Sequence, residues 1–292
     1  MGRKRRFIAA AAIAAGVIMA GYFGVKFHLE KIARQKVEEV ISKTSGLMEI
    51  DYRKVSVNLI GLNTHVKDVT VKATGEKEGI QIDEITVYKA RAGKDKSLDV
   101  HIALNGISVH ADQLIEDHDT VRDLGYQNIK ADMEVDYEYD DRKREFRLNT
   151  LRLGAKEIGD IDFSFRLTNI ELDPEKMALM LFTFPLIEIN EAELSYTDDS
   201  LVRRLLNFYA RKEGKTVDET IRQLTVKMDE EIARANDPLV TQSIEAVKKF
   251  INKPNKIMVS LSPKEPVSIG SLRDLVYQNE YIKLLNIRIR TS

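Results

Sequence analysis

The chain has 292 residues, of which 43% are hydrophobic and 31% charged, a composition typical of a globular protein. Its 45 basic and 46 acidic residues give a formal net charge of −1, so no basic excess favours a nucleic-acid partner. The absence of cysteine excludes a disulfide framework, a thiolate zinc site and a cysteine nucleophile.

The N-terminus carries the signals of a membrane anchor. A basic tail at residues 1–6 precedes the uncharged run Phe7–Val25, close to the roughly 20 helical residues that cross a hydrocarbon core. Because basic residues resist translocation, we expect a single-pass protein of a bacterial inner membrane, with a cytoplasmic N-terminus and a periplasmic C-terminal domain. A signal peptide cut after Ala20 is the alternative. The length of the run, and helical spacing that continues as an amphipathic stalk over residues 26–45, favour a retained anchor.

The apolar period changes from helical to two after the stalk. The clearest case is the segment 129–139, where apolar and charged residues alternate without a break. Similar alternation occurs at residues 98–104, 161–167 and 257–261. Every second side chain then points to the same face, so one face of the sheet is apolar and the other solvated. We therefore predict the α+β class: an anchor and stalk, then a mostly antiparallel β-sheet domain over residues 46–292.

One helical insertion interrupts the strands, at about residues 199–252. Asp198 or Asp199 can cap its first helix, which explains this acidic pair better than a pair of catalytic carboxylates. Thr216 to Glu219 form a capping box that opens a second helix. Asp237 caps a third helix that begins at Pro238.

The most apolar part of the predicted domain is the segment 177–187. It is too short to cross a membrane, and its simplest interpretation is a buried core segment. The alternative is a surface that faces lipid or a protein partner, since Met and Phe suit adaptable apolar surfaces. On that alternative the lipid- or partner-binding residues are Leu181, Phe182 and Phe184.

The sequence contains little that predicts catalysis. His110, Asp112, Asp117, His118 and Asp119 have metal-capable atoms but lack the spacing of a specific metal motif, so a polar loop is the simpler interpretation. No glycine-rich phosphate loop or nucleophile elbow is present. We expect no cofactor, no metal and no enzymatic activity.

Several segments together resemble a known group of proteins. They are the basic and apolar N-terminus and the segments 52–62, 151–163, 192–204, 210–214 and 261–267. This pattern resembles the bacterial AsmA-like and YdgA-like envelope proteins. The resemblance implies an inner-membrane anchor, a periplasmic β-rich domain and no known catalytic residues. Larger AsmA-like relatives are associated with phospholipid movement between membranes and with outer-membrane integrity.

These observations predict a non-enzymatic, membrane-anchored envelope protein. Its apolar sheet face is expected to bind lipid acyl chains of the membrane or an envelope protein partner. The alternative is a structural or assembly subunit of an inner-membrane complex, which holds its partners through the stalk and the helical hairpin. The lipid, the protein partner and the oligomeric state do not follow from the sequence.

Overall fold

The computed structural model describes residues 30–44, 48–58, 63–75, 79–93, 95–110, 123–172, 183–235, 237–275 and 281–292. Within them the chain is mostly antiparallel β-sheet with several helices, in agreement with the predicted α+β class. The predicted anchor, Phe7–Val25, lies outside these residues, and no helix inside them is long and apolar enough to span a membrane.

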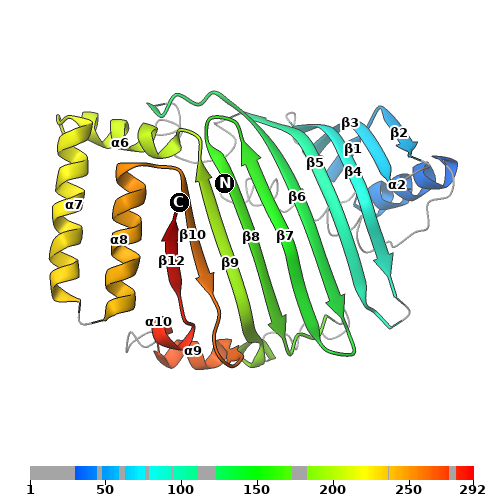
Figure 1. Cartoon of the computed structure of the whole chain (residues 1–292). Coiled ribbons are helices and arrows are strands. Elements are labelled where there is room, and N and C mark those ends of the chain that lie inside the picture. Colours follow the sequence, from blue (N-terminus) through cyan, green and yellow to red (C-terminus); the bar gives the residue numbers. More distant parts are fainter. Residues whose placement is uncertain are drawn as a thin grey trace. The chain divides into compact units, whose positions relative to one another are not determined.

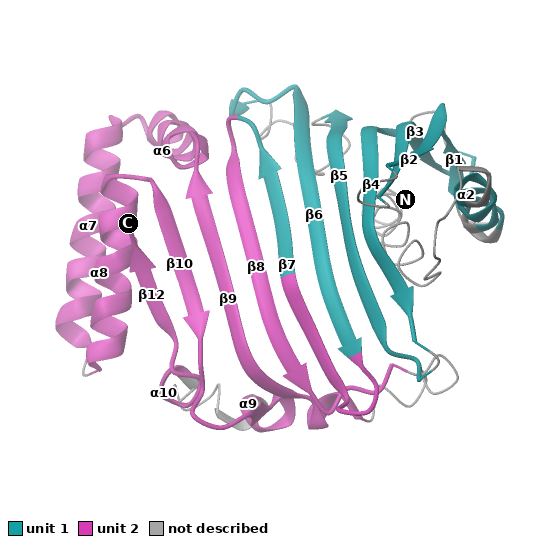
Figure 2. Cartoon of the chain, turned by 45° about the vertical axis from the view of Figure 1, so that its right-hand side comes forward, with its two compact units in different colours: residues 1–139, 150–156 teal, residues 140–149, 157–292 magenta. Residues whose placement is uncertain are grey.

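The chain is divided into two compact units. Unit 1 comprises residues 1–139 and 150–156, and unit 2 comprises residues 140–149 and 157–292 (Figure 2). The strand β7 (Glu145–Ala155) contributes its first half to unit 2 and its second half to unit 1. No change of composition in the sequence marks this division.

Unit 1 is built from antiparallel strands and a helix. Its described elements are α2 (Glu30–Thr44), β1 (Met48–Asp51), β2 (Lys54–Val57), β3 (Thr64–Ala73), β4 (Ile80–Ala92), β5 (Leu98–His110) and β6 (Asn128–Asp140). The strands pair in the order β1-β3-β4-β5-β6, and β2 also pairs with β3. Helix α2 packs against β1 and β2 (Figure 1).

Alternate residues of β5 and β6 form part of the core of unit 1. Val100 lies opposite Tyr137, and Ile102 lies opposite Val135, so these four side chains share one face of the sheet. All four are buried, and Val135 is only 8% exposed. The predicted strand at residues 129–139 is thereby confirmed, with Val135 on its core-facing side.

Unit 2 combines strands with the helices of the predicted insertion. Its remaining described elements are β8 (Gly159–Thr168), η2 (Phe184–Leu186), β9 (Glu188–Asp198), α6 (Leu201–Lys212), α7 (Val217–Arg234), α8 (Pro238–Asn252), β10 (Lys256–Leu261), β11 (Val267–Ser268), α9 (Ile269–Leu275), α10 (Tyr281–Leu284) and β12 (Arg288–Thr291). The strands pair antiparallel in the order β8-β9-β10-β12, and β11 pairs with β9. Helices α7 and α8 lie side by side, and α8 packs beside β12 (Figure 1).

Local hydrogen bonds begin each helix of the insertion. The Asp198 carboxylate accepts from the backbone N–H of Val202 at 2.9 Å, near the start of α6. Thr216 and Glu219 form the predicted reciprocal capping box at the start of α7. Asp237 accepts from the N–H of Leu239 at the start of α8. These side chains satisfy backbone donors that have no partner inside their helices, which is why the helices begin at these positions.

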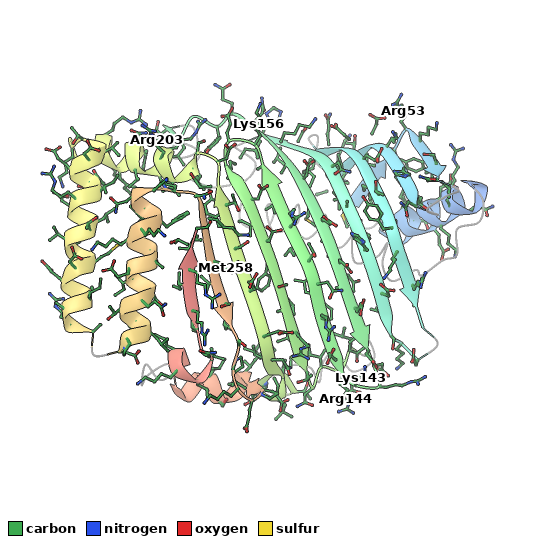
Figure 3. The ribbon with its side chains drawn as sticks, viewed as in Figure 1. Arg53, Lys143, Arg144, Lys156, Arg203 and Met258 are labelled. Atoms are coloured by element: carbon green, nitrogen blue, oxygen red, sulfur yellow. The ribbon has the colours of Figure 1, made fainter. Side chains whose placement is uncertain are left out.

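The turn between β6 and β7 is also stabilised locally. The Asp140 carboxylate accepts from the backbone N–H groups of Lys143 and Arg142, each at 3.1 Å. The bonds from the Lys143 backbone and side chain lower the pKa of Asp140 most, with a smaller contribution from Arg142. Arg144 then takes a left-handed conformation with φ of 50°, which reverses the chain at the end where Figure 3 labels Lys143 and Arg144.

Candidate apolar binding surface

Of the three residues predicted to bind lipid or a partner, the structure describes Phe184. It begins the short helix η2 in unit 2 and is 49% exposed, and Leu186 at the end of that helix is 62% exposed. Leu181 and Phe182 lie outside the described residues. Pro185, between these two exposed residues, lies against Gly270. A Cβ atom added at Gly270 would be only 2.9 Å from the carbonyl oxygen of Pro185. Helix η2 is therefore packed against α9 while Phe184 and Leu186 face solvent.

A larger apolar surface of unit 2 follows from the strand register. Phe163 of β8 lies opposite Leu194 of β9, which lies opposite Val259 of β10, which lies opposite Ile289 of β12. Residues directly opposite in antiparallel strands point to the same face, so these four form one row across the sheet. The same face carries a second set of apolar side chains from neighbouring rows: Ile161, Phe165, Ala192, Tyr196, Ile257 and Leu261.

None of the side chains in this set is buried. Leu194 is 43% exposed and Ile161 is 40% exposed. Phe250 of α8 packs edge-on against Tyr196 at a ring-centroid distance of 6.2 Å, at one end of the face. An apolar sheet face normally packs against another layer, so partial exposure of the whole face distinguishes it from the core of unit 1.

The opposite face of the same strands is polar. Ser164 lies opposite Glu193, and Arg166 lies opposite Glu191, with which it forms an ion pair at 3.1 Å. Met258, labelled in Figure 3, also belongs to this face, because its neighbours in β10 belong to the apolar one. The sheet of unit 2 is thus two-sided, and its chemistry differs sharply between the sides.

The apolar face continues into a groove between helices. Ile289 lines a groove of about 310 Å³ together with residues of α7 and α8. The other lining residues are Leu224, Lys227, Met228, Glu231, Ser243, Ile244 and Val247. Ile289 ends the row that begins at Phe163 and also lines this α7–α8 groove, so the sheet face and the groove share this residue.

A second groove adjoins the first. It lies between α6 and α7, has a volume of about 330 Å³, and is lined by Val202, Leu205, Leu206, Tyr209, Glu213, Thr220, Gln223, Leu224 and Lys227. Leu224 and Lys227 line both grooves, so the α6–α7 groove meets the α7–α8 groove at these two residues. We call the sheet face and the two grooves together the apolar surface of unit 2.

The polar clusters of unit 1 are explained by pairing between strands. Glu84 accepts hydrogen bonds from His65, Lys67 and Thr86, each at 3.0 Å. The bond from His65, followed by that from Lys67, lowers the pKa of Glu84 to about 2. These groups satisfy one another on adjacent strands, as ordinary cross-strand pairs do.

A second cluster of unit 1 also consists of side chains that pair between strands. His101 lies 2.8 Å from Glu134, which is also 3.7 Å from Arg152. The Tyr88 ring lies against His101 at a centroid distance of 4.5 Å.

The other polar candidates from the sequence do not form a site in the described chain. His110 is the exposed last residue of β5, and the acidic and histidine residues that follow, 112–119, lie outside the described part. Asp199 accepts from the backbone N–H of Glu157 at 2.7 Å and so stabilises a turn. The N-cap residue of α6 is Ser200 and neither predicted aspartate, although Asp198 accepts from the N–H of Val202 in the first turn. Within the described ranges, no group of three His, Cys, Asp or Glu side chains is arranged to hold a metal ion.

Comparison with known proteins finds a family match in the C-terminal half and one relative that is similar along most of the chain. A family model described as "Uncharacterized protein" matches residues 152–292. A protein of Aquifex aeolicus (strain VF5), described in the same words, is 27% identical, with 92% of this chain and 94% of that protein covered. The family match contains all the strands and helices that build the apolar surface of unit 2.

Sequence patterns predicted an apolar sheet face, but neither its partial exposure nor the adjoining grooves. The alternation at 161–167 and 257–261 correctly predicts strands, but the same pattern predicts a buried face as readily as an exposed one. The grooves depend on residues as distant as Leu224 and Ile289, which no local pattern connects.

Proposed function

We propose that this chain is a non-enzymatic envelope protein that binds lipid acyl chains on the apolar surface of unit 2. The observation that carries the proposal is the row from Phe163 to Ile289, whose apolar side chains face the same way and are not buried. The N-terminal run at residues 7–25 would hold the protein in a bacterial inner membrane, with residues 46–292 on the periplasmic side. The resemblance to AsmA-like envelope proteins is in keeping with this proposal.

An acyl chain suits this surface because it needs a continuous dry contact and no hydrogen-bonding partner. Each methylene group removed from water contributes about 0.8 kcal/mol to binding. The association itself costs translational and rotational freedom, so a chain must contact several side chains at once to bind measurably. The sheet face and the adjoining grooves provide such an extended contact.

A protein partner that adds a strand to the sheet fits less well. Such partners bind through the free backbone groups of an edge strand. The last strand of unit 2, β12, pairs with β10 on one side and packs against α8. A strand added next to β12 would meet that helix.

Crosslinking of a photoactivatable fatty acid to the full chain, extracted in detergent, tests the proposal. We expect crosslinks, mapped by mass spectrometry, in the peptides of β8, β9, β10 and the α7–α8 groove. Leu194→Glu places a charge in the middle of the apolar face and should reduce the yield several-fold. Glu193→Gln, one residue away on the opposite face, is the matched control and should leave it unchanged. Crosslinks scattered evenly over the chain, or an equal yield from both variants, would contradict the proposal.

A further inference from the structure

A lysine lies where the two grooves of unit 2 meet. Lys227 lines both grooves from α7, and its side chain is exposed. Within the described part of the chain, Lys227 forms no ion pair. The aliphatic stem of a lysine can follow an apolar surface while its ammonium group stays in water. Lys227 thus presents a positive charge at the border of an apolar groove.

The carboxylates that line the grooves already have their own cations. Glu213 pairs with Lys215 at 2.5 Å, and Glu231 pairs with Arg234 at 2.9 Å. The pKa of Glu213 is lowered mainly by the hydrogen bond and charge of Lys215, and to a smaller extent by the more distant charge of Lys227. Arg234 is shared with Glu230, at 3.6 Å, and among the described residues that line the grooves Lys227 is the cation without an ion pair of its own.

The volume of the α7–α8 groove limits how many acyl chains it can hold. At about 310 Å³, the α7–α8 groove is at the small end of the roughly 300–1,000 Å³ typical of ligand pockets. This volume suits one acyl chain better than the paired chains of a phospholipid. The apolar side chains Leu224, Met228, Ile244, Val247 and Ile289 would contact that chain.

We infer that the ligand of this surface is a fatty acid, with its tail in the α7–α8 groove and its carboxylate paired with Lys227. This inference rests on the proposed function, because it assumes that the surface binds an acyl chain. It adds the class of ligand: a single chain with a negative headgroup in preference to a neutral one. An exposed ion pair of this kind is weak, so the expected preference is about two- to fivefold in affinity.

The test compares photoactivatable dodecanoic acid with the corresponding dodecanol on the full chain in one detergent at pH 8. The measured quantity is the ratio of the two half-saturating concentrations for crosslinking to the α7 and α8 peptides. Partition into micelles cancels when this ratio is compared between variants. We expect Lys227→Gln to abolish a preference for the acid of about two- to fivefold while leaving dodecanol unchanged. Lys227→Arg should retain the preference.

Lys215→Gln is the matched control, because it removes a nearby lysine that is already paired with Glu213. It should keep the preference for the acid. An unchanged ratio in Lys227→Gln would overturn the headgroup inference, while crosslinking of dodecanol to the apolar surface would still support the proposed function. Failure of both probes to crosslink anywhere on the apolar surface would refute the inference and the proposed function together.

Discussion

Two leucines of unit 2 allow a direct test of whether the apolar sheet face is a surface or a core. Leu194 on β9 is 43% exposed, whereas Leu285, just before β12, is 5% exposed. Both are changed to alanine, so the chemical change is identical and the same unit is perturbed. The two positions, Leu194 and Leu285, differ mainly in how much of the leucine side chain is exposed.

The expected magnitudes follow from burial. Truncating a buried leucine to alanine typically costs 2–5 kcal/mol, because the transfer free energy is lost and a cavity remains. Fully burying a leucine contributes about 1.5–3 kcal/mol, so the partly buried Leu194 should account for about 1 kcal/mol, with no closed cavity. At about 2–4 °C per kcal/mol for a unit of this size, Leu194→Ala should lower the melting temperature by a few degrees. Leu285→Ala should lower it by roughly 4–20 °C.

Ligand binding should show the opposite order. Leu194→Ala removes part of the contact between an acyl chain and the sheet face, worth about 1 kcal/mol, and should weaken crosslinking of the photoactivatable fatty acid to the peptides of β8, β9 and β10 about fivefold. Leu285→Ala should bind normally below its melting temperature. Thermal unfolding followed by circular dichroism, with crosslinking at 20 °C, measures both quantities. If Leu194→Ala melts as low as Leu285→Ala and still binds fatty acid normally, the face is part of the core and the reasoning is wrong.

Two further predictions concern the Glu84 cluster of unit 1 and the membrane topology of the chain. The ionised form of Glu84 is favoured in the folded protein, where its pKa is about 2, so its stabilising effect is complete above the unfolded pKa of about 4.3 and is lost as the pH falls towards 2. Urea unfolding at pH 6 and pH 2.5 should therefore show a larger loss of stability in the unaltered chain than in Glu84→Gln, and equal losses would contradict the role of this cluster. A reporter that is active only in the periplasm should work when fused after Ser292. A soluble mature form that begins near Gly21 would instead indicate a cleaved signal peptide.

The elements of this fold could largely be predicted because their causes are local. Unbroken alternation at residues 129–139 predicts a strand and places Val135 on its apolar side, since a strand directs successive side chains to opposite faces. The capping box of Thr216 and Glu219 predicts the start of α7, because the hydrogen bonds involved span only three residues. The three helices of the insertion and the antiparallel character of the sheet follow from patterns of this kind.

The candidate site could not be predicted in the same way. Ile161 and Val135 occupy equivalent positions in alternating strands, yet Val135 is buried in the core of unit 1 and Ile161 is among the exposed side chains of unit 2. Alternation determines the direction of a side chain relative to its strand. Burial depends on which distant segment packs above it, and that is decided by tertiary contacts.

The sequence by itself therefore determined the main strands, the apolar face of each, and the three helices of the insertion; it did not predict η2, β11, α9 or α10. Only the tertiary structure decided that the apolar face of β8, β9 and β10 is left partly exposed. Tertiary structure alone also brought Ile289 of β12 beside α7 and α8 and placed Lys227 at the junction of two grooves. The physical reason is that backbone hydrogen bonds and side-chain direction are short-range properties, whereas a groove is formed by segments that meet only after the chain has folded.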